Sequence, residues 1–228
     1  AMRAARMEYM ATSRTIQLLP PELLVKTGDV DHADWNYRPL LGQIQRLRFR
    51  LINQMLDGVQ TDRMLEVGYG SGVFMPHLSQ FCRELYGVDI HPRPAEVAAA
   101  LAKNGIKASL HTSSVTEMPM IASGTVGAVV IVSAIEYVED IDRACLELRR
   151  VMTPDAVLCL VTPGHSPVVD FGLKVLTGEG ARDNYGDRRA RLLPSLKRHF
   201  SVDREVHWPW IGGSFFRLYT ALRLRQRS

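Results

Sequence analysis

Three glycines at alternate positions, Gly68, Gly70 and Gly72, follow a short apolar run at residues 64–67. This pattern predicts a buried strand that turns sharply into a helix. Glycine adopts positive φ without steric penalty, and because it lacks a Cβ it lets the backbone lie directly against a ligand. The spacing is G-x-G-x-G, whereas the dinucleotide fingerprint would place its third glycine one residue later, at Val73. We therefore expect an α/β fold with a ligand site at this turn.

A second strand is predicted at residues 85–90, with an acid near its carboxyl end. This acid, Asp89, follows Glu66 by 23 residues. Neighbouring strand ends form the ligand crevice of an open α/β sheet, and a carboxylate there can accept both hydroxyls of a ribose. We expect Glu66 and Asp89 to face one nucleoside-like ligand.

Hydrophobic periodicity predicts the remaining elements. Helices are expected at residues 43–56, 73–81, 94–103, 140–152, 168–176 and 188–199. Strands are expected at residues 107–111, 126–132 and 156–161, followed by an antiparallel pair at 201–208 and 215–224. Pro194 is expected to break the last helix. Along the first helix, Arg46, Arg48 and Arg50 are expected mostly on the outer, solvated side.

The chain resembles the class I S-adenosylmethionine-dependent methyltransferases, and within them the branch with small-molecule and quinone methyltransferases. The matching motifs lie at residues 65–72, 87–89 and 129–138, in that order. The resemblance implies an α/β, Rossmann-like sheet of seven strands with helices on both faces, an antiparallel last strand and an N-terminal helical lid. It also implies S-adenosyl-L-methionine as cofactor and S-adenosyl-L-homocysteine as product.

The resemblance assigns parts of the chain to cofactor and acceptor. Residues 1–42 would be a lid that covers the substrate, and residues 43–228 the cofactor-binding domain, with residues 165–200 as an insertion beside the acceptor pocket. Asp89 would fix the ribose, and Ser114 with the Val115 amide would meet the adenine where many relatives use an aspartate. The full set of expected cofactor contacts is Glu66, Gly68, Tyr69, Gly70, Gly72, Asp89, Ile90, Ser114, Val115 and Ser133.

Two residues are catalytic candidates. His165 follows a predicted strand, and imidazole titrates near neutrality, so it is the best candidate for a general base. Tyr137 stands where many relatives carry histidine, and it would either orient the acceptor or close the pocket. Methyl transfer from a sulfonium can also proceed without a base, in which case His165 has no catalytic role.

Candidate substrate contacts come from two loops. Trp35, Tyr37 and Arg38 precede the first regular helix, and Tyr185 lies in a glycine-rich stretch near residue 180. The alternative for Trp35 and Tyr37 is that they anchor a loop on the domain, because large aromatic side chains are usually packed for area.

Charge and cysteine content limit which classes of binding partner are expected. The formal net charge is +4, and residues 217–228 contain four arginines and no acid, so the rest of the chain sums to zero. No nucleic acid partner is expected, although the basic terminal strand leaves peripheral membrane contact open. Three isolated cysteines suggest neither disulfides nor a zinc site, and no other metal site is expected; a reducing cytoplasm fits best. No apolar run is long enough to span a bilayer, and no signal peptide is evident.

The sequence favours direct in-line transfer of a methyl group to an oxygen, nitrogen or carbon of a small-molecule acceptor. Three alternatives remain. The chain could be a non-catalytic S-adenosylmethionine-binding module or a methyltransferase that acts on a lipid at a membrane surface. An NAD-dependent oxidoreductase would require pyrophosphate contacts that the spacing of the glycines does not supply. The sequence does not indicate the acceptor or the oligomeric state.

Overall fold

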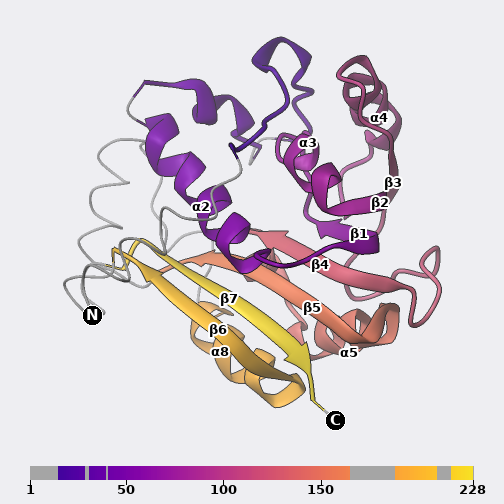
Figure 1. Ribbon diagram of the computed structural model, residues 1–228, viewed down its shortest axis with the longest axis vertical. Helices are drawn as coiled ribbons and strands as arrows, with labels where there is room; N and C mark the ends of the chain where they lie inside the picture. The colour runs from indigo at the N-terminus through magenta and orange to yellow at the C-terminus, as the bar shows by residue number, and fades with distance from the viewer. Residues whose placement is uncertain (1–14, 29–30, 40, 165–187, 210–216, 228) are drawn as a thin grey trace.

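A seven-stranded sheet forms the centre of the molecule, in the computed structural model that describes residues 15–28, 31–39, 41–164, 188–209 and 217–227 (Figure 1). The strand order is β3-β2-β1-β4-β5-β7-β6, and β7 runs antiparallel to the other six strands. The predicted sheet with an antiparallel last strand is confirmed. The strands are β1 (Thr61–Val67), β2 (Cys82–Asp89), β3 (Ala108–Thr112), β4 (Val126–Val132), β5 (Met152–Pro163), β6 (Phe200–Trp208) and β7 (Tyr219–Gln226).

Helices cover both faces of this sheet, as predicted (Figure 1). On one face lie α2 (Leu41–Met55), α3 (Met75–Leu78) and α4 (Pro94–Lys103); on the other lie α5 (Ile141–Val151) and α8 (Arg188–His199). Alternate residues of β4 supply two cores: Ala128 and Val130 lie in the first core, on the α2 side, and Val129 and Ile131 lie in the second core, on the α5 side. Such an uninterrupted apolar run is typical of a central parallel strand that is buried on both faces.

The part of the N-terminal segment that the structure describes packs over the glycine turn. It contains two short 3₁₀ helices, η1 (Pro21–Leu23) and η2 (Ala33–Tyr37). The Leu19 amide donates to the Val73 carbonyl at 2.9 Å, and Arg93 at the start of α4 donates to the Lys26 carbonyl at 2.6 Å. Residues 1–14, 29–30 and 40 of the expected lid lie outside the described residues. None of the helices described is long and apolar enough to cross a membrane.

Two predicted helices differ from those observed. Instead of spanning residues 73–81, α3 covers four residues and is followed by the 3₁₀ helix η3 (Ser79–Phe81). Its start is delayed because the turn continues to Met75, whose amide donates to the Gly72 carbonyl at 3.1 Å. The predicted break at Pro194 was wrong: α8 continues through it, with Leu192 and Leu196 fully packed in the second core.

One crossover in the parallel part of the sheet lacks a helix. Helices lie between β1 and β2, between β2 and β3 and between β4 and β5, but residues 113–125 connect β3 to β4 as an irregular segment. We call this segment the β3–β4 loop. It therefore has no regular backbone ladder of its own and depends on contacts with other elements for its position.

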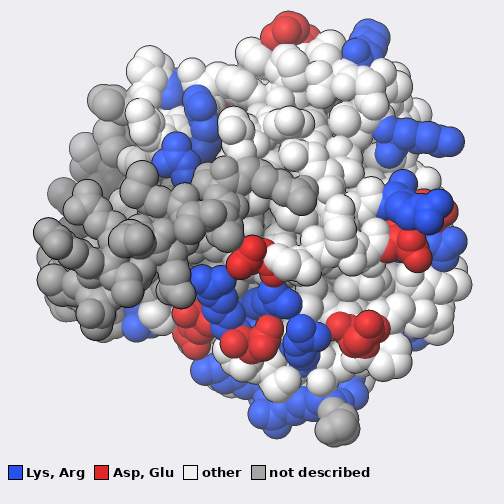
Figure 2. All heavy atoms as spheres, viewed as in Figure 1, with Lys and Arg blue, Asp and Glu red and all other residues white. Residues whose placement is uncertain are grey.

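Arginines of the basic terminal strand make structural contacts. An Nη1 of Arg223 donates to the carbonyls of Met55 and Asp57, at 3.3 and 2.9 Å, and so binds the C-terminal end of α2. Arg223 and Arg225 both lie within 4 Å of the Asp203 carboxylate, at 2.9 and 3.6 Å. Figure 2 shows basic and acidic side chains intermixed over this part of the molecule. These two arginines thus join β7 to α2 and β6.

Candidate cofactor and active site

A cavity of about 990 Å³ opens at the carboxyl edge of the sheet. Residues at the ends of β1, β2 and β4 form its floor, at positions 66–71, 88–92 and 132–134. Its walls come from the start of the β3–β4 loop, from the N-terminal segment and from α2. The volume lies at the upper end of the range for small-molecule sites, about 300–1,000 Å³. The cavity therefore has room for a cofactor and an acceptor together.

Each of the three positions in the turn requires glycine for a different structural reason. All three have positive φ, of 75°, 49° and 72° in chain order. A Cβ on Gly68 would lie 2.3 Å from the Cβ of Ala134 at the end of β4, and one on Gly72 would lie 3.0 Å from Val97 of α4. A Cβ on Gly70 would meet nothing closer than 3.8 Å, on the cavity side near Asp31. Gly68 and Gly70 line the cavity, whereas Gly72 packs against α4.

The Gly70 peptide is held from both sides by the end of β2. An oxygen of Asp89 accepts from the Gly70 amide at 2.8 Å, and the His91 ring Nε2 lies 3.1 Å from the Gly70 carbonyl. Because His91 Nδ1 accepts from the Arg93 amide at 3.1 Å, the neutral ring carries its proton on Nε2 and donates to Gly70. A carboxylate has about four acceptor sites, so Asp89 retains capacity for ribose hydroxyls.

Glu66 is a buried acid on the cavity floor. Only 3% of its surface is exposed, and among the described residues its Oε2 has no hydrogen-bond partner. Burial raises the Glu66 pKa well above its ordinary value; the Asp89 charge adds to this shift and the Arg48 charge opposes it. A cationic group of a ligand would stabilise the ionised form of Glu66.

Arg48 also lines the cavity, so the expectation that it lies on the outer side of its helix was wrong. Its Nε is buried without a partner among the described residues, and its guanidinium lies 5.0 Å from the Phe49 ring centroid. The sequence contained the signal: Arg48 is four residues from both Ile44 and Ile52, and therefore shares the face of α2 that packs on the sheet. A half-buried guanidinium without a protein acceptor is suited to bind a ligand carboxylate.

Three more polar groups of the floor have no hydrogen-bond partner among the described residues. They are the hydroxyls of Tyr69, Ser71 and Ser133. Burial, together with the Asp89 charge, raises the pKa of the Tyr69 phenol. Ser133 is the only non-glycine residue with positive φ among those described, at 50°. Such backbone strain and unpaired groups are typical of ligand sites.

The cavity side of the β3–β4 loop contains Ser114 and Val115, the two residues that the resemblance would place against the adenine. Here Ser114 Oγ accepts from the Thr116 amide at 3.2 Å and lies 2.7 Å from the Thr116 hydroxyl. Val115 is buried in the second core. Ile90, at the end of β2, lies at the cavity mouth with 78% of its surface exposed, and so offers an apolar face to a planar ligand.

Of the described residues expected to contact the acceptor, Trp35 and Tyr137 line the cavity, and Tyr37 and Arg38 do not. Trp35 lines the cavity and stacks on His32, with ring centroids 4.0 Å apart. Tyr37 is absent from the lining, and its hydroxyl donates to the Leu19 carbonyl. Arg38 forms an exposed ion pair with Asp34, also outside the lining. Tyr137 lies at the mouth, 41% exposed.

His165 and Tyr185 lie outside the described residues. The lining includes several residues that the sequence analysis did not select, namely Thr27, Asp31, His32, Gln45, Arg48, Phe49, Arg143 and Tyr219.

Comparison with known proteins assigns the class. Residues 65–160 match the family model described as a methyltransferase domain. Together with the sheet order, this match identifies a class I S-adenosylmethionine-dependent methyltransferase domain, with S-adenosyl-L-methionine as its cofactor. A comparison with curated protein sequences found no match.

Solved structures with the same fold cover most of the chain. The N-methyltransferase NodS from Bradyrhizobium japonicum WM9, in complex with S-adenosyl-L-homocysteine, is 16% identical with a TM-score of 0.62, over 89% of this chain and 95% of NodS. An S-adenosylmethionine-dependent methyltransferase from Aquifex aeolicus is 18% identical with a TM-score of 0.57, over 82% and 98%. Geranyl diphosphate C-methyltransferase from Streptomyces coelicolor A3(2) is 13% identical with a TM-score of 0.61, over 99% and 98%. At these identities the likeness establishes the fold.

Proposed function

We propose that this protein transfers the methyl group of S-adenosyl-L-methionine to a small-molecule acceptor by direct in-line displacement. The observation that carries the proposal is the cavity at the carboxyl edge, where the glycine turn, Asp89, the buried acid Glu66 and the guanidinium of Arg48 meet. When bound, the cofactor would supply a methyl group activated by its sulfonium, with a neutral thioether as the leaving group. The protein therefore contributes mainly alignment and exclusion of water.

The residues present fit a ligand that is a nucleoside at one end and an amino acid at the other. Glu66 is suited to the ammonium group and Arg48 to the carboxylate, since each has a buried polar atom without a partner among the described residues. Asp89 would accept the ribose hydroxyls, and Ser114 and Val115 would border the base. The positive φ of Gly70 and the open space at its Cβ position allow close approach of the ligand.

The acceptor would occupy the side of the cavity lined by Trp35, His32, Tyr137 and Tyr219. Aromatic walls favour an acceptor with an apolar or planar part. The neighbours named above include an N-methyltransferase and a C-methyltransferase of small molecules, which supports a small-molecule acceptor without selecting the atom. His165 remains the candidate general base, and Tyr137 the candidate for orienting the acceptor.

Calorimetry with two ligands tests the cofactor assignment. S-adenosyl-L-homocysteine carries the amino-acid end, whereas 5′-methylthioadenosine lacks it. Replacing Arg48→Gln should weaken binding of S-adenosyl-L-homocysteine about tenfold or more, because hydrogen bonds to charged groups contribute about 1.5–3 kcal/mol. Binding of 5′-methylthioadenosine should not change. Arg50→Gln is the matched control, since Arg50 is exposed on the same helix and outside the lining.

Four results separate the alternatives. Equal weakening of both ligands would mean that Arg48 shapes the cavity and does not bind a carboxylate. NAD binding in place of S-adenosyl-L-homocysteine would refute the methyltransferase assignment. Binding without turnover, in a labelled-methyl screen across phenols, amines, isoprenoid phosphates and lipid vesicles, would favour a non-catalytic cofactor-binding module, and turnover only on vesicles would favour a lipid acceptor.

A further inference from the structure

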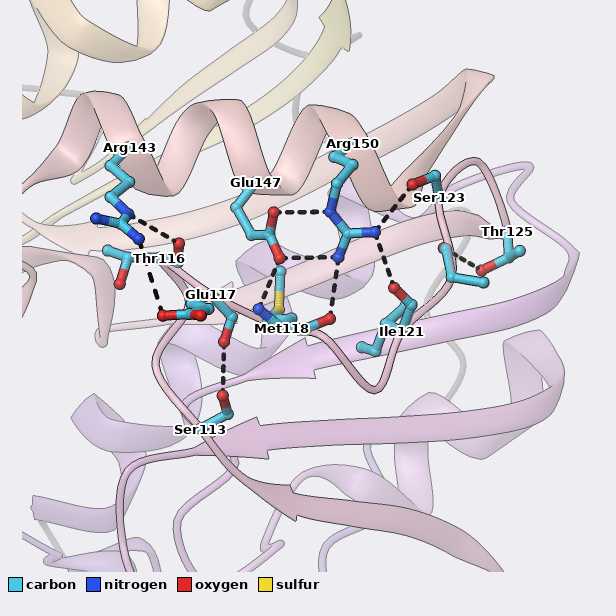
Figure 3. Close-up of polar contacts among 11 residues, drawn as sticks. Ser113, Thr116, Glu117, Met118, Ile121, Ser123, Thr125, Arg143, Glu147 and Arg150 are labelled. Atoms are coloured by element: carbon cyan, nitrogen blue, oxygen red, sulfur yellow. Dashed lines mark hydrogen bonds and ion pairs between the residues drawn. The ribbon is translucent and has the colours of Figure 1, made fainter.

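The β3–β4 loop is held in place by side chains of α5 (Figure 3). Arg143, Glu147 and Arg150 stand on one face of this helix, at i, i+4 and i+7, and each contacts the loop. Arg143 Nε lies 3.4 Å from the Thr116 carbonyl. The loop has no helix of its own, so these contacts replace the support that a regular element would give.

Arg150 uses all of its hydrogen-bonding capacity in this contact. A guanidinium has five N–H donors. Two donate to the Glu147 carboxylate, both at 2.8 Å, and one donates to the Met118 carbonyl at 2.9 Å. The other two donate to the Ile121 carbonyl and the Ser123 hydroxyl, both at 3.0 Å. A lysine has three donors and no planar fork, and cannot reproduce this arrangement.

Glu147 completes the clamp. Its Oε1 accepts from the Met118 amide at 2.6 Å, so the Glu147–Arg150 pair binds both the N–H and the C=O of Met118. The Met118 side chain is fully buried in the second core. The hydrogen bond from Arg150 lowers the pKa of Glu147 below its ordinary value, which keeps the carboxylate ionised. Loop position is thus fixed immediately after the residues that border the cavity.

This position matters because the hydroxyl that would replace the missing aspartate is already engaged. Ser114 Oγ bonds to Thr116 within its own turn, and the turn is closed by the Glu117 amide donating to the Ser114 carbonyl at 3.0 Å. Backbone groups at residues 114–115 are therefore left to distinguish one base edge from another. A backbone group has no rotamer with which to adjust, so its selectivity depends on where the loop is held.

We propose that the Glu147–Arg150 pair is a positioning device that sets the nucleobase end of the cavity and its preference for adenine. Neither residue lines the cavity, so both act through the β3–β4 loop. The inference rests on the proposed function, because it assumes that the nucleoside end of the cofactor lies against residues 113–116.

The test compares two ligands that differ only at the base. S-adenosyl-L-homocysteine has the 6-amino group of adenine, and S-inosyl-L-homocysteine has a 6-oxo group that reverses the hydrogen-bond polarity. We expect Arg150→Lys to reduce the ratio of the two affinities about tenfold, equivalent to about 1.4 kcal/mol. Glu147→Gln should give a smaller reduction, because the amide keeps an oxygen for the Met118 N–H.

Arg149→Lys is the control. Arg149 is the adjacent residue on α5, but it donates to the carbonyls of His199 and Arg227, away from the loop. It should leave the ratio unchanged, even if it lowers the melting temperature by a similar amount. Hydrogen exchange at residues 113–121 should increase in the Arg150 and Glu147 variants and not in the Arg149 variant.

Two results would overturn the inference. If exchange of the loop increases but the affinity ratio stays at the wild-type value, the clamp stabilises the fold and does not set base preference. If Arg149→Lys changes the ratio as much as Arg150→Lys, the effect is one of general stability. Glu147→Gln decides the question if Arg150→Lys does not fold. Failure of the wild type to bind either ligand would instead refute the proposed function, and the inference with it.

Discussion

The buried acid Glu66 should make the ligand-free wild type less stable than a variant with a neutral side chain at this position. Because burial raises the Glu66 pKa, the folded chain retains a proton that the unfolded chain releases, so wild-type stability falls as pH rises above the ordinary carboxyl pKa of 4.5. Glu66→Gln has no proton to lose. The variant should therefore match the wild type in acid and exceed it at higher pH.

The size of the gain follows from the unpaired Oε2. A buried polar group without a hydrogen bond destabilises a fold by about 1–3 kcal/mol, and more when it is charged. For a chain of this size each kcal/mol corresponds to about 2–4 °C in melting temperature. We expect Glu66→Gln to raise the melting temperature by several degrees near pH 8 and by almost nothing near pH 4, measured by calorimetry without ligand.

Bound ligand should reverse the order of thermal stability, so that the wild type becomes more stable than Glu66→Gln. If Glu66 pairs with the ammonium group, saturating S-adenosyl-L-homocysteine will stabilise the wild type more than the variant. Glu84→Gln is the control, because Glu84 forms an exposed ion pair with Arg63 at 2.6 Å and its pKa is lowered by that contact. The reasoning is refuted if Glu66→Gln lowers the melting temperature near pH 8, or if its effect is the same at both pH values.

Three further substitutions probe the floor of the cavity. Gly68→Ala should destabilise the fold by about 2–4 kcal/mol in denaturant unfolding, since residue 68 has positive φ and the new Cβ would lie 2.3 Å from the Cβ of Ala134. Gly70→Ala, whose Cβ would have no atom nearer than 3.8 Å, should lower the affinity for S-adenosyl-L-homocysteine more than it lowers the stability of the fold. Asp89→Asn should weaken that ligand about tenfold in calorimetry, because a charged acceptor is replaced by an amide, and unchanged affinity would remove Asp89 from the ribose contact.

Elements whose signals are local were predicted well from the sequence. Residues 94–103 form α4 and residues 126–132 form β4 with the predicted bounds, because proline at the helix start and a β-branched run determine them without help from distant residues. The glycine turn and Asp89 were likewise found at the cavity. Their position at one edge of the sheet follows from the order of strands, which the repeated β–α pattern indicates.

Features that depend on packing were not predicted. Arg48 was assigned to solvent because its charge was given more weight than its place on the buried face of α2. The contacts of α2 with β4, β5 and β7 determine which part of that face extends past the sheet and reaches the cavity. Pro194 was expected to break α8, yet Leu192 and Leu196 pack in the second core on either side of it. Sequence patterns do not report such compensation between distant residues.

The distribution of unpaired polar atoms supports a ligand site without reference to any relative. Buried polar groups in proteins are nearly always hydrogen-bonded, so those without partners need a cause. In the described part of the chain such atoms also occur away from the cavity, for example on Asn36 and Thr162, but those on Arg48, Glu66, Tyr69, Ser71 and Ser133 come from three separate elements and line one cavity. An acid and a guanidinium nitrogen left without partners in the same cavity do not stabilise the fold, because each loses its hydration without gaining a hydrogen bond. Their explanation is a ligand that carries both a cation and an anion.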